Sequence, residues 1–218
     1  MLIQALKQHY EAQIKHLRLK AIEFDNNAMD NESFHQSIQE LQDKNLHNKS
    51  HEKNFEALSH NLMSKLMEFE IHLKNLLNDC NKIKMPKNKD SKNEESQIEI
   101  CNLLAILHTK AQTLKEDFAL VQVDLAEILE VLKLMQKNGE LVSLLTLKLG
   151  KKQDAIYANK ILHDISSSAR LADKTLEGIG LGLRSAAECI CQEYEQLLAK
   201  IHKNVKCLEK IGGKAILD

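Results

Sequence analysis

The stretch "IEICNLLAILHTKAQTLKEDFALVQVDLAEILEVLKLM", residues 98–135, decides the fold of this chain. Apolar residues recur in it at alternating spacings of four and three, from Ile100 through Leu114 to Met135. A β-strand cannot produce this spacing, whereas an α-helix with one persistent apolar face produces it directly. Further apolar residues beside this seam, such as Leu103, widen the stripe to the width that helices use in a bundle. The stretch therefore predicts a long helix that packs against more than one neighbour.

The second half of the chain repeats this spacing and predicts a helical hairpin. Two helices of nearly equal length are expected at 97–149 and 154–211, joined by a short turn. Gly150 would end the first helix, and Asp154 would cap the second. Asn138-Gly139 offers a competing break inside the first helix, because both residues tolerate a left-handed conformation.

Two features of the second hairpin stay open at this point. The glycines at 178–182 favour a close crossing with a neighbouring helix, but they would also suit a hinge. Gly212-Gly213 is expected to end the last helix.

The first 83 residues predict a second, weaker hairpin. Helical spacing runs from Ile3 to Ala28, resumes after a possible cap at 30–33, and returns from Phe55 onward. Between them, residues 43–54 contain a single apolar residue. We expect this segment to be either a solvated loop or an exposed helix, and in both cases to leave a gap in the apolar seam.

Pro86 is the only proline of the chain and lies in a lysine-rich polar segment. A proline disfavours helix at the residue before it, so the preceding helix should stop near Lys84. We therefore expect an N-terminal helical hairpin at 1–83, a polar connector at 84–96, and a C-terminal long helical hairpin at 97–218. The predicted fold class is all-α, an elongated antiparallel helical bundle built from coiled-coil hairpins.

Composition narrows the class of function. The net charge of −1 gives no field that would attract nucleic acid, so no nucleic-acid partner is expected. No apolar run approaches the ~20 residues that span a bilayer, and polar residues interrupt the N-terminal segment too early for a signal peptide. The five cysteines are an odd number without a disulfide pattern. A cytoplasmic protein without a membrane span, with reduced and mostly buried cysteines, is expected.

Three small groups of residues resemble parts of metal or redox sites, but each is incomplete. Glu32 and His35 form one Glu-x-x-His, where di-iron bundles need two. His47 and His51 are four residues apart and could share a helix face for a metal, yet no further ligand stands at a fixed spacing. Cys189-Ile190-Cys191 places its sulfurs on different helix faces. No phosphate loop or nucleophile motif is present. The sequence therefore predicts no enzymatic activity, no cofactor and no metal.

Lysines line the polar side of the last predicted helix, at 200, 203, 206, 210 and 214. A solvated face that complements the helix C-terminus explains them, and an acidic partner or membrane surface is the alternative.

The segment "LKLMQKNGELVSLLTLKLGKKQDAIYANK", residues 132–160, resembles the last helix of the FlgN family of flagellar export chaperones. The shared features are an asparagine, a leucine-rich helix and a following tyrosine, here Tyr157. In that family the tyrosine lies near the C-terminus, whereas in this chain a further long helix is expected after it. The resemblance implies a chaperone function and no residue assignments.

We expect a non-enzymatic helical interaction protein: a scaffold, adaptor or assembly subunit that acts through coiled-coil packing. The alternative is a secretion or assembly chaperone of the flagellar export type, which would bind an amphipathic helix of a client. Apolar residues outside the seam, at Ile106, Val123, Val131 and Leu134, exceed what one neighbouring helix covers, so a homo-oligomer or a protein partner is expected. The candidate interface consists of seam residues: Leu104, Leu107, Leu114, Phe118, Val121, Leu125, Ile128, Leu132, Leu176, Ile179 and Leu183.

Overall fold

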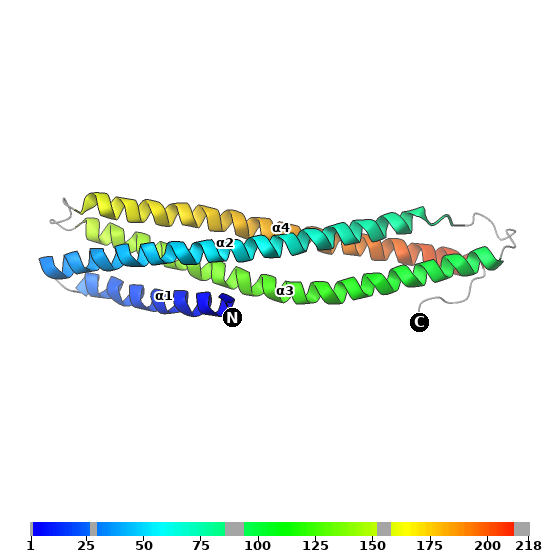
Figure 1. The fold of residues 1–218 in the computed structure, drawn as a ribbon, viewed down its shortest axis with the longest axis horizontal. Helices are drawn as coiled ribbons and strands as arrows, with labels where there is room; N and C mark the ends of the chain where they lie inside the picture. Colours follow the sequence, from blue (N-terminus) through cyan, green and yellow to red (C-terminus); the bar gives the residue numbers. More distant parts are fainter. Residues whose placement is uncertain (1, 27–29, 86–93, 152–157, 212–218) are drawn as a thin grey trace. The chain divides into compact units, whose positions relative to one another are not determined.

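The computed structural model describes residues 2–26, 30–85, 94–151 and 158–211. These residues form four helices: α1 (Leu2–Asn26), α2 (Asn31–Lys82), α3 (Glu94–Gly150) and α4 (Asn159–Ile211). Consecutive helices run antiparallel (Figure 1). No strand occurs in the described ranges, so the prediction of an all-α helical bundle is confirmed.

The helix ends follow local chemistry. The Ser33 backbone N–H donates to Asp30 Oδ1 at 2.8 Å, so Asp30 caps α2 at the predicted cap segment. Hydrogen bonds from Ser33 also lower the pKa of the Asp30 carboxyl. α2 ends at Lys82, four residues before Pro86, and α3 ends at Gly150, as the glycine predicted.

Two helix boundaries differ from the sequence predictions. α3 begins at Glu94, so residues 94–96 of the predicted connector are helical. α4 begins at Asn159, after the predicted start at Asp154. The proposed cap at Asp154, Pro86 with the rest of the connector up to residue 93, and the terminal Gly212-Gly213 lie outside the described residues.

The helices divide into two compact units. Unit 1 contains Met1–Asn61 and Leu125–Leu183, and unit 2 contains Leu62–Asp124 and Arg184–Asp218. Each unit therefore takes segments from both of the predicted hairpins. Whether 1–83 and 97–218 fold separately stays a prediction.

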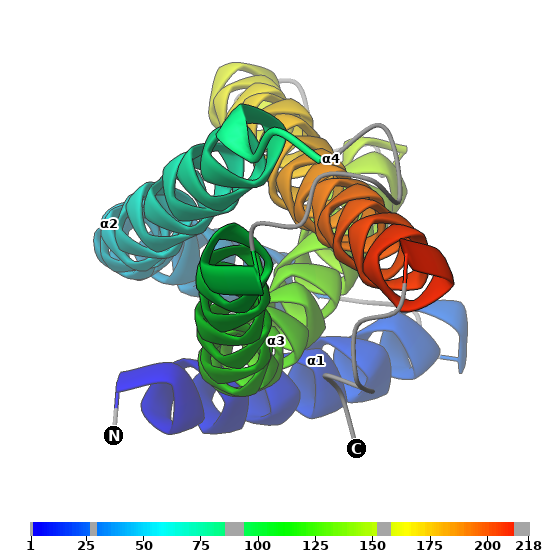
Figure 2. The same ribbon diagram turned by 90° about the vertical axis from the view of Figure 1, so that its right-hand side faces the viewer.

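Unit 1 packs α1 against segments of α2, α3 and α4 (Figures 1 and 2). Its main apolar cluster draws on all four helices: Ile14, Leu17, Phe24, Phe34, Ile38, Leu41, Leu141, Val142, Leu145, Leu149, Ala158, Leu162 and Ile165. Close helix crossings accompany this cluster. A Cβ on Gly180 would lie 3.0 Å from Leu132 Cδ1, and one on Gly139 would lie 3.8 Å from the Ala169 carbonyl oxygen. α3 and α4 run unbroken through both glycines, so the competing break at 138–139 does not occur, and Gly180 lies at a close contact between α3 and α4.

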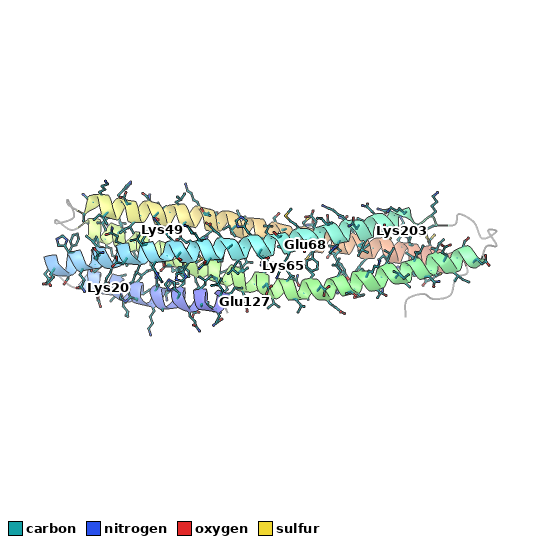
Figure 3. All side chains as sticks on the ribbon, in the orientation of Figure 1. Lys20, Lys49, Lys65, Glu68, Glu127 and Lys203 are labelled. Atoms are coloured by element: carbon teal, nitrogen blue, oxygen red, sulfur yellow. The ribbon has the colours of Figure 1, made fainter. Side chains whose placement is uncertain are left out.

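Unit 2 contains three helical segments, from the end of α2, the start of α3 and the end of α4. Its buried side chains are Leu62, Leu66, Leu73, Cys80, Leu104, Leu107, Ala111, Phe118, Val121, Ile190, Leu197, Ile201, Val205 and Leu208. The lysines of α4 lie on its surface, with Lys203 exposed and labelled in Figure 3. Among the described helices, none is long and apolar enough to cross a membrane.

The structure refines two sequence expectations. Residues 43–54 belong to α2, so the exposed-helix alternative holds for this segment, except that Asn48 is only 6% exposed and occupies the expected gap. The cysteines are free, as expected, but only Cys80 is buried and Cys191 is exposed. Periodicity in apolar residues could show neither result.

Candidate functional site

The buried polar face at residues 43–54 lies against α1 in unit 1. His9 Nε2 lies 3.2 Å from Asn48 Oδ1 and 3.0 Å from Gln13 Nε2. Asn48 and Gln13 are both buried, so they fix the orientation of the His9 ring from two helices. The first half of the chain therefore fills its seam here with hydrogen-bonding groups instead of apolar ones.

Three histidines meet at this polar face. His9 comes from α1, and His47 and His51 come from successive turns of α2. The His9 ring centroid lies 4.1 Å from that of His51 and 5.2 Å from that of His47. The Nε2 atoms of His47 and His51 are 3.2 Å apart. One ligand nitrogen of each ring lies within 4.8 Å of the other two.

Protonation of His51 is disfavoured. Burial, and then the neighbouring His9 and His47, lower the pKa of His51. His51 Nδ1 is buried and has no hydrogen-bond partner. A neutral imidazole with a free nitrogen is the form in which histidine binds a metal.

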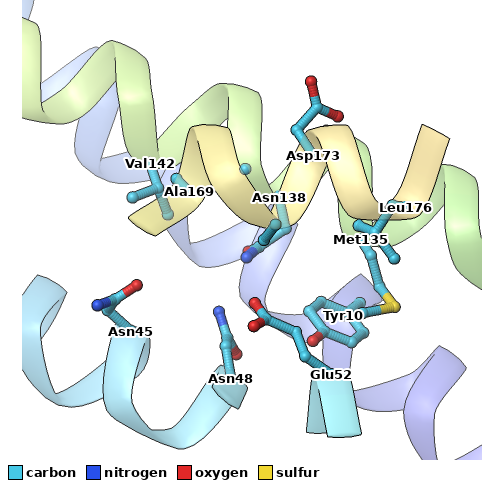
Figure 4. Close-up of a pocket in the computed structure, with 12 residues that line it drawn as sticks. Tyr10, Asn45, Asn48, Glu52, Met135, Asn138, Val142, Ala169, Asp173 and Leu176 are labelled. Atoms are coloured by element: carbon cyan, nitrogen blue, oxygen red, sulfur yellow. The ribbon is translucent and has the colours of Figure 1, made fainter. Parts of the chain in front are cut away.

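A small cavity of about 20 Å³ with both polar and apolar side chains in its lining lies beside Asn48. Figure 4 shows Asn48 and Glu52 of α2 facing Tyr10 of α1 and Asn138 of α3. The Tyr10 hydroxyl and Asn138 Oδ1 are buried without a hydrogen-bond partner. Burial raises the pKa of Tyr10, and burial together with Glu56 raises the pKa of Glu52. A polar cavity of this size has room for one water molecule.

A second group of potential ligands lies in unit 2, where Glu70, Cys189 and Glu193 approach one another. Lys74 forms ion pairs with both glutamates, to Glu70 on its own helix and to Glu193 at 3.5 Å. The lysine ammonium therefore already offsets one of the two negative charges that a cation would neutralise. We assign no metal to this group.

Unit 2 also contains an apolar groove of about 400 Å³. Phe69 and Leu73 of α2, Leu114 and Phe118 of α3, and Ile190 and Tyr194 of α4 line it. The rings of Phe69 and Phe118 meet edge to face, with centroids 5.6 Å apart.

Polar side chains border this groove. Lys115, Gln122 and Glu195 lie at its edge, and Lys115 Nζ lies 5.8 Å from the centre of the Tyr194 ring. A groove with apolar walls and a polar edge suits the apolar face of an amphipathic segment.

The predicted interface residues lie mostly inside the chain's own units. Eight of the eleven are buried: Leu104, Leu107, Phe118, Val121, Ile128, Leu132, Leu176 and Leu183. Leu114, Leu125 and Ile179 are half-buried. Of the whole set, only Leu114 and Phe118 line the groove.

The four apolar residues predicted to lie outside the seam differ in their exposure to solvent. Ile106 and Val123 are exposed, at 50% and 58% of their surface. Val131 is buried and Leu134 is half-buried, because unit 1 packs around that part of α3. Part of the excess apolar surface expected from the sequence is therefore covered within the chain, and part is not.

The other sequence candidates are not brought together. Glu32 and His35 are both exposed. Cys189 and Cys191 have different surroundings. Cys191 lines the groove, whereas Cys189 lies close to Glu70. Sequence reasoning missed His9 as a companion of His47 and His51, because the contact joins two helices and leaves no fixed spacing in the chain.

A scan against protein-family models finds no match, and searches of the curated proteins and of the solved structures find none either.

Proposed function

We propose that this chain is a non-enzymatic helical interaction protein, and that the unit 2 groove accepts the apolar face of a helix from a partner protein. The observation that carries the proposal is the groove itself, which the described residues leave open, with seven large apolar or aromatic side chains on its walls. Monomeric proteins rarely leave a concave apolar surface without a ligand or partner for it.

The dimensions of the groove favour a helix as its occupant. Its lining on α3 runs from Leu114 to Gln122, and its lining on α4 runs from Ile190 to Leu198. Each stretch rises about 12 Å along its helix, which equals about two turns. A partner helix would place two or three apolar anchors there, at i, i+3 and i+4 spacing.

The edge of the groove favours a partner helix with mixed charge. Lys115 and Glu195 stand on α3 and α4, so the groove has one cation and one anion at its border. Rim charges of this kind set orientation and association rate more than affinity. An amphipathic helix with both signs of charge beside its apolar face fits this border.

The open groove also supports a secretion or assembly chaperone as a second candidate. A chaperone for amphipathic helices needs an apolar groove that stays open before the client arrives, whereas a permanent subunit needs only a complementary surface. The five free cysteines, all in unit 2, support a reducing, cytoplasmic location for either function.

Site-specific photo-crosslinking tests the proposal. A photoreactive phenylalanine replaces Ala119, which is exposed and lines the groove. The matched control carries the same replacement at Ala199, which is also exposed and in unit 2 but does not line the groove. In the native cells we expect the first variant to crosslink to one protein, at residues of an amphipathic helix, and the control to give no such product.

Two results would count against the proposal. A crosslink at 119 that maps onto this chain itself would make the occupant a second copy. Equal products at 119 and 199 would show that the groove has no preferred partner.

A further inference from the structure

We propose that His9, His47 and His51 of unit 1 form a binding site for a divalent cation of the zinc class, which joins α1 to α2. The sequence alone offers only the pair on α2, and the fold adds the third ring from α1. The site is independent of the groove in unit 2.

The spacing of the rings fits tetrahedral coordination. Zinc binds histidine nitrogen at about 2.0–2.1 Å, so two ligands of a tetrahedral ion lie about 3.3 Å apart. The Nε2 atoms of His47 and His51 are 3.2 Å apart, close to that edge length. The third nitrogen lies within 4.8 Å, and small rotations of the rings would bring it to bonding distance. His47 is exposed and has room for such a rotation.

The donor set decides the class of metal. Three imidazoles suit zinc and neighbouring late first-row ions, whereas calcium and magnesium require oxygen ligands. Three protein ligands leave a fourth tetrahedral position for water, and the exposed edge at His47 gives solvent a path to it.

The surroundings of the rings resemble the outer ligand shell of a metal site. When the proton of His9 is on Nε2, that nitrogen donates to Asn48 Oδ1 at 3.2 Å, and Nδ1 is the ring nitrogen left to bind a cation. Such outer contacts orient metal-binding histidines and raise their affinity.

Metal binding at this site would stabilise the contact between α1 and α2. His9 is the only ligand that α1 supplies, and it is thirty-eight positions from His47 in the sequence. A ligand that binds only the folded form stabilises it in proportion to the logarithm of its concentration. Removing His9 should therefore abolish both the tight site and its effect on α1.

Isothermal titration calorimetry of the chelator-treated full chain with zinc chloride tests the proposal. We expect one tight equivalent per chain, and at least a tenfold loss of affinity in each of His9→Gln, His47→Gln and His51→Gln. Because His47 is exposed, His47→Gln should leave the fold intact and keep the test valid if the other variants unfold. Bound Co²⁺ gives a second readout, since four-coordinate cobalt absorbs visible light far more strongly than the six-coordinate hydrated ion.

The chain contains ten histidines, and two of them outside the cluster, on the same two helices, provide matched controls. His16 lies exposed on α1 beside Glu40, and His60 lies exposed on α2, where its ring hydrogen-bonds the Glu56 carbonyl. His16→Gln and His60→Gln should keep the tight equivalent. Equal losses in control and cluster variants, or no saturable equivalent in the native chain, would overturn the proposal.

Discussion

Unit 1 and unit 2 both contain segments of α2, α3 and α4, but they differ in how far the apolar faces of these helices are covered. Unit 1 has a fourth helical segment, α1, and the cavities that α1 borders are about 20 and 10 Å³. Unit 2 has three segments and keeps an apolar groove of about 400 Å³. Unit 1 also has open grooves of about 550 and 330 Å³ that α1 does not border. The comparison therefore indicates that α1 closes the part of unit 1 that it covers, whereas the three described segments of unit 2 leave an apolar groove for another molecule.

The two units also differ in the polar contacts between their helices. In unit 1, His9 Nε2 lies within hydrogen-bond distance of Gln13 on α1 and of Asn48, in the part of α2 that is poor in apolar residues. In unit 2, the only comparable contact is the weak one from the Asn204 amide to the Cys80 sulfur, at 3.6 Å, among the contacts described there. Burial raises the pKa of that thiol, so Cys80 behaves as a small apolar group.

The largest expected effect on stability comes from truncating one core leucine in each unit. Leu145 is 1% exposed in unit 1, and Leu197 is 0% exposed in unit 2. Leu145→Ala and Leu197→Ala should each lower the free energy of unfolding by about 3 kcal/mol, because a buried leucine leaves a cavity. Hydrogen exchange should show the lost protection mainly in the unit that carries the substitution. Equal loss in both units would show a single cooperative core.

A smaller effect is expected from the two buried tyrosine hydroxyls. The hydroxyls of Tyr10 in unit 1 and Tyr194 in unit 2 both lack a protein partner. Tyr10 borders a closed polar cavity that can hold one water, so Tyr10→Phe should cost about 1 kcal/mol. Tyr194 borders the apolar groove, so Tyr194→Phe should leave the free energy of unfolding nearly unchanged. Urea unfolding followed by circular dichroism measures both, and the reverse order would contradict the contrast in polarity.

The smallest effect concerns ion pairs between helices at the surface. Lys7 meets Glu130 at 2.8 Å in unit 1, and Lys65 meets Asp124 at 3.4 Å in unit 2. Both pairs are solvent-accessible, and exposed pairs contribute little to stability. Lys7→Met and Lys65→Met should therefore leave the urea midpoint unchanged at moderate salt. A loss as large as that expected for Tyr10→Phe would mean that these pairs fix the helix register.

Much of the fold was predictable because it follows from apolar spacing. The apolar seam from Ile100 to Met135 predicts the helix α3, and Gly150 predicts where α3 ends. Asp30 predicts the start of α2, which it caps. Gly180 followed from size alone, since only a residue without a side chain allows the Leu132 methyl to approach so closely.

The candidate sites were not predictable because they depend on contacts between helices. His9 and Asn48 are thirty-nine residues apart, and no periodic signal links them. The groove depends on how Leu114, Phe118 and Tyr194 diverge in space, which the identity of those residues does not specify. The seam residues named as an interface turned out to be mostly buried, because the same apolar spacing describes an internal core and an external surface.

Binding of a hydrophobic fluorescent dye to the isolated chain tests the central claim most directly, because such a dye binds accessible apolar surface. We predict saturable dye binding to the native protein and at least a fivefold loss in Ala119→Trp, whose indole would fill the groove. The matched Ala199→Trp variant should bind dye as the native chain does. Absence of dye binding to the native chain, or equal binding by both variants, would contradict the claim that unit 2 holds an open apolar groove.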